Sequence, residues 1–276
     1  MKHFIQYRPL VAEYDGEWRW QSSGMGYIFQ TDNGHFVVVD GGMDDEDAYR
    51  ITELLKQYSD NPVVDLWIIT HPHKDHCTAL ISFAKNGELK KQVTVNAVCF
   101  NNPDYFDERC KADIATMQEL ADMLKCKYIK ALSGDVYSID DIEICILFVW
   151  SDLAGLSDSN ELSTIFTVSD GKTKVMIPGD TSEYVLNYIC DKYKNTPQIF
   201  KSDIVQLPHH GLNGGTVEFF DLVQAKTVLV PISVAGYRVV VNDRDYGGRG
   251  NAHALSMADR IYYSALGTRE IPTNNV

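Results

Sequence analysis

The sequence predicts a fold of the α/β or α+β class, in which strands and helices follow one another along most of the chain. Short apolar runs, which are typical of buried strands, are separated by longer amphipathic segments with helical spacing. These elements occur in two blocks that each mix strands and helices, which fits two packed sheets with helices outside. The chain has 276 residues, of which 45% are hydrophobic, so it can bury a large core.

The first block opens with a hairpin. Residues 27–30 and 35–40 read as its two strands, and the Asn33-Gly34 pair between them suits a tight turn. The further elements expected in this block are a helix over 45–58, a buried strand over 63–70, a helix that includes 77–84, a strand over 93–100 and an amphipathic helix over 109–125.

The second block begins with four apolar runs that predict successive strands. The expected elements are strands over 136–139, 142–148, 165–169 and 174–177, a helix over 182–193, a strand over 203–207, a helix over 216–224, a strand over 227–231 and a last helix over 254–265.

Residues 71–76, with the sequence His-Pro-His-Lys-Asp-His, are the most informative stretch of the chain. They crowd His71, His73, Asp75 and His76 into one strand-to-helix turn, where Pro72 fixes the backbone. Neutral imidazole and carboxylate groups are ligands for zinc and similar divalent metals. A polar surface turn is the alternative. However, the chain has only eight histidines, and three of them within six residues are unlikely to occur by chance.

One turn cannot easily wrap four side chains round a single ion. The sequence therefore predicts two ions, with His71 and His73 on one and Asp75 and His76 on the other. Two divalent ions a few Å apart lower the pKa of a bridging water toward neutrality, and the resulting hydroxide attacks a carbonyl carbon or a phosphorus. The sequence contains no Gly-x-Ser-x-Gly elbow and no P-loop that would indicate another mechanism.

The motif at residues 71–76 resembles the signature of the metallo-β-lactamase superfamily. Later segments are similar to further motifs of that family, in the same order: Gly41-Gly42, Ile177-Pro178-Gly179-Asp180, Leu207-Pro208-His209-His210-Gly211 and Asn251-Ala252-His253. The resemblance covers the chain from Gly24 to the C-terminus. It implies a four-layer αββα sandwich of two mixed sheets with outer helices, formed by residues 1–276 as a single domain. The branch it is most similar to includes metallo-hydrolase domains of bacterial competence proteins and phosphorylcholine esterases.

The resemblance also implies further ligands at strand ends. Asp180 is expected to bridge both ions, because Gly179 lets the backbone turn sharply and a carboxylate has two oxygens. An ordinary helix N-cap is the alternative role for Asp180. Between His209 and His210 we expect only one ligand, since adjacent residues on an extended chain point to opposite sides. His209 is the predicted ligand, and His210 is predicted to face the substrate.

Two features of the pattern leave alternatives open. His253 is expected to donate a proton to a substrate oxyanion, although a capping or surface role explains a lone histidine equally well. The chain has no histidine between His76 and His209 to serve as a third ligand of the first ion. Without it, the first site would hold only His71, His73 and the shared Asp180. Asn160 or Ser163 lies in the region of the chain where such a third ligand would be expected.

Composition supports a globular enzyme without naming one, and the expected substrate is a small, anionic molecule. A formal net charge of −13 argues against tight binding of nucleic acid, which needs many Lys and Arg contacts to phosphates. The six cysteines form no Cys-x-x-Cys pair and favour reduced thiols in a cytoplasmic protein. The first residues do not read as a signal peptide, and no apolar run is long enough to predict a membrane span.

The sequence therefore predicts a hydrolase that depends on two divalent metal ions. Zinc is the expected metal, with manganese or iron as alternatives. A phosphodiester is the first choice of substrate, by analogy with the branch, and Asp75, His210 and His253 are the expected catalytic residues. The alternatives are hydrolysis of a carboxylic ester, lactone or thioester, redox chemistry at a di-iron site, and a non-catalytic metal-binding protein.

Overall fold

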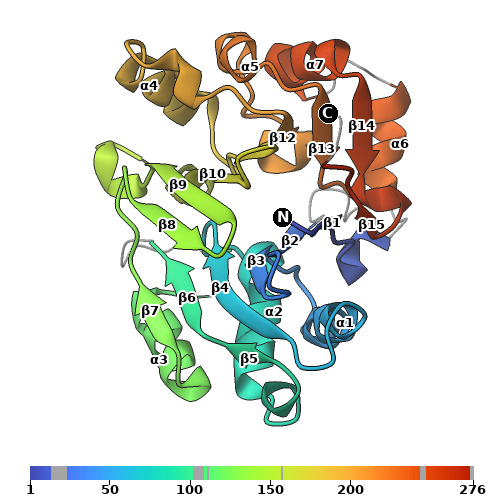
Figure 1. Cartoon of the computed structure of the whole chain (residues 1–276). Coiled ribbons are helices and arrows are strands. Elements are labelled where there is room, and N and C mark those ends of the chain that lie inside the picture. Colours follow the sequence, from blue (N-terminus) through green and yellow to red (C-terminus); the bar gives the residue numbers. More distant parts are fainter. Residues whose placement is uncertain (14–23, 102–108, 111, 157, 243–246, 274–276) are drawn as a thin grey trace.

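Two mixed β-sheets pack face to face, and helices cover the outer face of each sheet (Figure 1). The computed structural model describes residues 1–13, 24–101, 109–110, 112–156, 158–242 and 247–273. The predicted αββα sandwich is confirmed. Among the described residues, every helix is too short or too polar to cross a lipid bilayer.

The first sheet has the strand order β15-β1-β2-β3-β4-β6-β7, with β5 paired to β4. The predicted hairpin is present as antiparallel β2 and β3, and the strands from β3 through β4 and β6 to β7 run parallel. The strand bounds are β1 (His3–Gln6), β2 (Gly26–Gln30), β3 (Phe36–Asp40), β4 (Val63–Ile69), β5 (Thr94–Val95), β6 (Ala97–Phe100), β7 (Lys127–Ile129) and β15 (Arg269–Glu270).

The second sheet has the strand order β14-β13-β12-β11-β10-β9-β8. Strands β8 to β11 are antiparallel, and β11 to β14 are parallel. The bounds are β8 (Val136–Ile139), β9 (Ile142–Phe148), β10 (Ile165–Ser169), β11 (Lys174–Ile177), β12 (Ile204–Gln206), β13 (Thr227–Val230) and β14 (Arg260–Tyr263).

Three apolar layers hold the sheets and helices together. The helices are α1 (Asp45–Lys56), α2 (Lys74–Lys85) and α3 (Ile114–Leu124) on the first sheet, and α4 (Glu183–Lys192), α5 (Val217–Val223), α6 (Val234–Asn242) and α7 (Gly248–Met257) on the second. In β4, Trp67 and Ile69 face the helices, whereas Leu66 and Ile68 face the second sheet. Both faces of β4 are therefore buried, which explains its nearly continuous apolar sequence.

The C-terminal region differs from the prediction. The expected last helix over 254–265 is wrong, because α7 ends at Met257 and residues 260–263 form β14, a parallel edge strand beside β13. Ile261, Tyr262 and Tyr263 suit an extended chain, and β13 offers them a free edge for hydrogen bonding. The short strands β1, β7 and β15 and the helix α6 were not predicted, since their segments are too short or too mixed in polarity to show a period.

The candidate ligands lie at the carboxyl ends of parallel strands. Strands β3 and β4 of the first sheet and β11, β12 and β13 of the second end beside one another. The segments that follow β4, β11 and β12 contain the residues that the sequence singles out as candidate ligands. In open α/β sheets this edge is where ligands usually bind.

Candidate metal centre

The segment after β4 turns directly into α2 and so gathers its polar side chains. His73 occupies the N-cap position of α2, and its carbonyl accepts hydrogen bonds from the backbone N–H of His76 and Cys77. Asp75 and His76 therefore lie in the first helical turn, whereas His71 lies in the bend between β4 and α2. All three histidines are buried.

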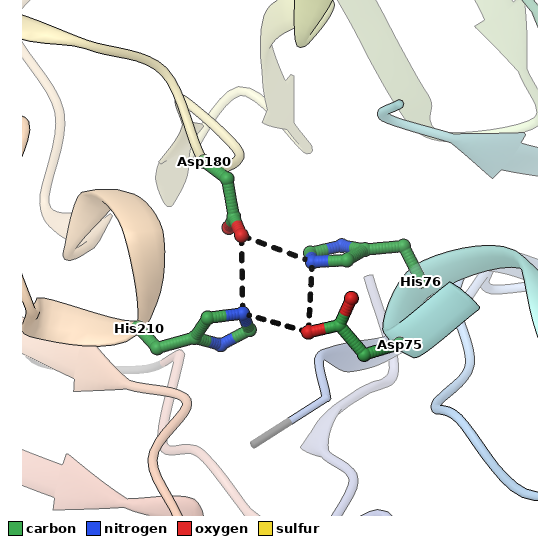
Figure 2. Close-up of side chains that lie close together, drawn as sticks. All are labelled: Asp75, His76, Asp180 and His210. Carbon is green, nitrogen blue, oxygen red and sulfur yellow. Dashed lines mark hydrogen bonds and ion pairs between the residues drawn. The ribbon is translucent and has the colours of Figure 1, made fainter. Parts of the chain in front are cut away.

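Four side chains from three parts of the chain converge at this point: Asp75, His76, Asp180 and His210 (Figure 2). One ligand atom from each lies within 4.8 Å of the others. The Asp180 Oδ2 atom is 3.0 Å from His210 Nε2 and 3.2 Å from His76 Nε2. The Asp75 Oδ2 atom is 3.2 Å from His210 Nε2 and 3.8 Å from His76 Nε2.

These separations suit a tetrahedral metal ion. Four ligands at about 2.0 Å from a zinc ion lie about 3.3 Å from one another. His210 Nε2 is close to both carboxylates but makes a hydrogen bond to neither, and Asp180 Oδ1 also has no such partner in the described chain. His76 Nε2 is hydrogen-bonded to Asp180 Oδ2 at 3.2 Å, and the four side chains surround a shared space, as ligands of one ion do (Figure 2).

The charges within the cluster also favour a cation. Burial alone would lower the pKa of His210 and His76, but Asp180 and the neighbouring carboxylates outweigh it, raising the pKa of His210 to about 10 and that of His76 well above its usual value. Burial alone would raise the pKa of Asp75 and Asp180, but the two histidines hold both values well below the usual range. The two carboxylates need compensating positive charge, which one divalent ion would supply in place of the histidine protons.

Each histidine of the cluster has a partner at Nδ1, the ring nitrogen that faces away from the other three side chains. Asp40, the last residue of β3, contacts His76 Nδ1 at 2.8 Å, and the Thr70 amide and hydroxyl donate to its carboxylate at 2.8 and 2.9 Å. The Pro231 carbonyl accepts from His210 Nδ1 at 2.8 Å. Partners of this kind fix the tautomer that directs Nε2 toward a metal. Sequence analysis missed this role of Asp40, although its place directly before Gly41-Gly42 was a signal.

Asp180 reaches the cluster from the turn after β11. Gly179 has a φ of 64°, and a Cβ on it would lie 2.9 Å from the Ser163 side chain, so only glycine fits this turn. The Ser163 hydroxyl accepts from the Asp180 amide at 3.0 Å. Ser182 is the N-cap residue of α4. The alternative of Asp180 as a helix cap is therefore wrong, since its carboxylate faces His76 and His210.

The late histidine pair is arranged in the opposite way to the prediction. His210 is buried in the cluster, whereas His209 is half-buried and its Nδ1 contacts Asn213 Oδ1 at the rim. The prediction assumed an extended chain, but His209 and His210 have φ values of 46° and 57° and form a left-handed turn. The geometry favours His210 over His209 as the ligand from this loop.

A second group of possible ligands lies beside the first. His71 Nε2 is 3.9 Å from Asp180 Oδ2 and has no hydrogen-bond partner among the described residues. Burial and the neighbouring His76 lower the pKa of His71 well below its usual value, so its imidazole is neutral and suited to a metal. The His73 ring lies 4.5 Å from the His71 ring, but its Nε2 is engaged by Ser159 Oγ.

A cavity of about 240 Å³ opens onto both groups. It is lined by His73, Lys74, Asp75, Arg109, Asn160, Asp180, His209 and His210. Two cationic side chains, Lys74 and Arg109, thus face a space whose floor holds the candidate ligands. Sequence analysis did not identify Arg109, Ser159 or the cavity, because the residues come from segments far apart in the sequence.

His253 is not brought to the cluster. It lies on α7, where its Nε2 is 2.7 Å from Asp221 Oδ1 of α5, and it does not line the cavity. The contact joins the outer surfaces of two helices. The surface role that the sequence left open therefore fits His253 better than contact with a substrate.

Comparison with known proteins identifies the family. Residues 21–230 match the metallo-beta-lactamase superfamily, and the chain belongs to this superfamily. Among curated proteins no sequence matches the chain.

Solved structures that share the fold include the following two. The metallo-beta-lactamase fold protein YhfI from Bacillus subtilis has a TM-score of 0.59 and 13% identity, over 98% of this chain and all of that one. CmlA from Streptomyces venezuelae, a diiron beta-hydroxylase, has a TM-score of 0.55 and 10% identity, over 98% of this chain. The match spans only 54% of the CmlA chain.

Proposed function

We propose that this protein is a metal-dependent hydrolase that cleaves a phosphodiester in a small anionic molecule. The observation that carries the proposal is the convergence of Asp75, His76, Asp180 and His210 at the floor of an open cavity. Membership of the metallo-beta-lactamase superfamily supports it.

The residues of the centre divide between two positions that share Asp180. His71 and His73 would hold one divalent ion, and Asp75, His76 and His210 would hold the other. Zinc is the expected metal, with manganese or iron as alternatives, since imidazole and carboxylate suit all three. Divalent ions bound there would activate water and polarise the scissile phosphoryl group.

The protein's own groups would orient the substrate and accept a proton. Lys74 and Arg109 line the cavity and would attract the phosphate charge, although Arg109 also pairs with Asp158 at 3.1 Å. Asp75 lines the same cavity and remains a carboxylate, because His76 and His210 lower its pKa despite burial. One oxygen of Asp75 would hold the ion, and its other oxygen would accept the proton that water loses.

The same residues would suit a carboxylic ester, lactone or thioester, since a carbonyl oxygen is polarised in the same way. The structural likeness to CmlA, described as a diiron beta-hydroxylase, keeps iron-based oxidation as a second candidate.

We expect hydrolysis of bis(4-nitrophenyl) phosphate by protein loaded with zinc or manganese. Prolonged treatment with a chelator should reduce the rate to that of buffer, and either metal should restore it, because the proposed reaction depends on the ions. Release of 4-nitrophenol at constant pH measures the rate, and 4-nitrophenyl acetate serves as the ester comparison. Hydrolysis of the acetate alone would favour the ester alternative, and a rate unaffected by chelation would contradict metal dependence.

A further inference from the structure

The two proposed metal positions differ in the number and kind of their ligands. Asp75, His76, Asp180 and His210 already hold their ligand atoms within 4.8 Å of one another. His71 is not part of that group, and its Nε2 lies 3.9 Å from the shared Asp180 carboxylate. The first group also contains two carboxylates, whereas the position near His71 has only the one that it shares.

The second histidine of the weaker position is already engaged. His73 Nε2 is hydrogen-bonded to Ser159 Oγ, to which Arg109 Nη2 donates at 3.3 Å. The bond engages Nε2, so an ion that binds His73 through Nε2 must displace it.

Asn160 lies next to Ser159 and has an unused acceptor. Its backbone amide donates to Asp158 Oδ1 at 2.8 Å, which fixes it in the 3₁₀ turn over Ser159–Leu162. The residue is 6% exposed, lines the cavity beside Asp180 and His210, and its Oδ1 finds no hydrogen-bond partner within the described chain. A buried polar atom of this kind usually has a water or an ion as its partner.

We propose that the two metal positions differ in affinity, and that Asn160 Oδ1 is the third ligand of the weaker one. The Asp75, His76, Asp180 and His210 position binds first and tightly. The position of His71, His73 and Asp180 binds second, completed by the amide oxygen of Asn160. This inference rests on the metal centre of the proposed function.

The chemistry of the ligands explains the difference. A neutral amide oxygen is a poorer partner for zinc than an imidazole or a carboxylate. The active, doubly loaded form would therefore need a higher free concentration of metal than the singly loaded form.

Calorimetric titration of chelator-treated protein with zinc ions alone tests the inference. The wild-type protein should bind two ions in two resolved phases. Asn160→Ala should weaken only the second phase, by roughly tenfold or more, the range seen when residues that support a metal site are removed. Asn160→His should strengthen the second phase, because it supplies an imidazole in place of the amide.

Ser159→Ala is a matched control in the same turn. It removes a hydroxyl that contacts His73 but no proposed ligand, so both phases should remain resolved and the second phase should weaken less than in Asn160→Ala. Thermal unfolding followed by circular dichroism checks that each variant is folded, and Asn160→His keeps the test intact if Asn160→Ala does not fold.

Each outcome has a distinct meaning. Two equal sites, or a single site, in the wild-type protein would overturn the inference while leaving a metal centre in place. An unchanged second phase in both Asn160 variants, with an altered KM, would make Asn160 a substrate contact instead. Failure of the wild-type protein to bind any zinc would overturn the proposed function itself.

Discussion

We expect Asp180→Ala to lose bound metal at both positions and to lose hydrolase activity with it. The Asp180 carboxylate lies between the two groups of histidines, 3.0 Å from His210, 3.2 Å from His76 and 3.9 Å from His71. No other carboxylate of the described chain contacts both groups. Elemental analysis of the purified variant and its rate on a phosphodiester measure the two losses.

Asp113→Ala provides the matched control. Asp113 is a true N-cap, since its side chain accepts from the Thr116 amide at 2.6 Å at the start of α3. Removing such a cap costs about 1 kcal/mol of stability and should leave metal content unchanged. If Asp180→Ala behaves like Asp113→Ala, with metal retained and only a small loss of stability, the bridging role is contradicted.

The second large effect is expected at His210. His210→Ala should weaken metal binding at the tight position by at least about tenfold, because a ligand is lost and not merely its support. Elemental analysis after dialysis against metal-free buffer measures the depletion.

His209→Ala is the neighbouring control. Its side chain lies at the rim of the cavity against Asn213, so the variant should retain metal. Metal lost from His209→Ala and kept by His210→Ala would restore the assignment that the sequence predicts. Metal kept by both would remove this loop from the centre altogether.

Much of the fold was predictable because local patterns and packing agree. Strands β8, β9, β10 and β11 begin and end as their apolar runs predict, and the parallel strand β4 is recognisable because both of its faces are buried. The layer arrangement came from the resemblance of the motifs and not from periodicity. The error over residues 254–265 arose where a helix and an edge strand follow each other without a clear break.

The site was predictable to the extent that its residues are adjacent in the sequence. The turn at residues 71–76 brings its candidate ligands together by itself, so a single motif was enough to find it. The geometry favours His210, which the sequence did not choose, because His209 and His210 form a left-handed turn that two histidines rarely adopt. Asp40, Ser159 and Asn160 have roles that only the packing of distant segments creates.

The location of bound metal tests the account most directly. Crystals of zinc-loaded protein, measured at the zinc absorption edge, should show an anomalous peak at about 2.0–2.2 Å from Asp75, His76, Asp180 and His210. Replacement of the present contacts among these four side chains by bonds to one ion would confirm the central claim. A zinc-loaded crystal with no peak between them, and with the histidines still paired to the carboxylates, would contradict it.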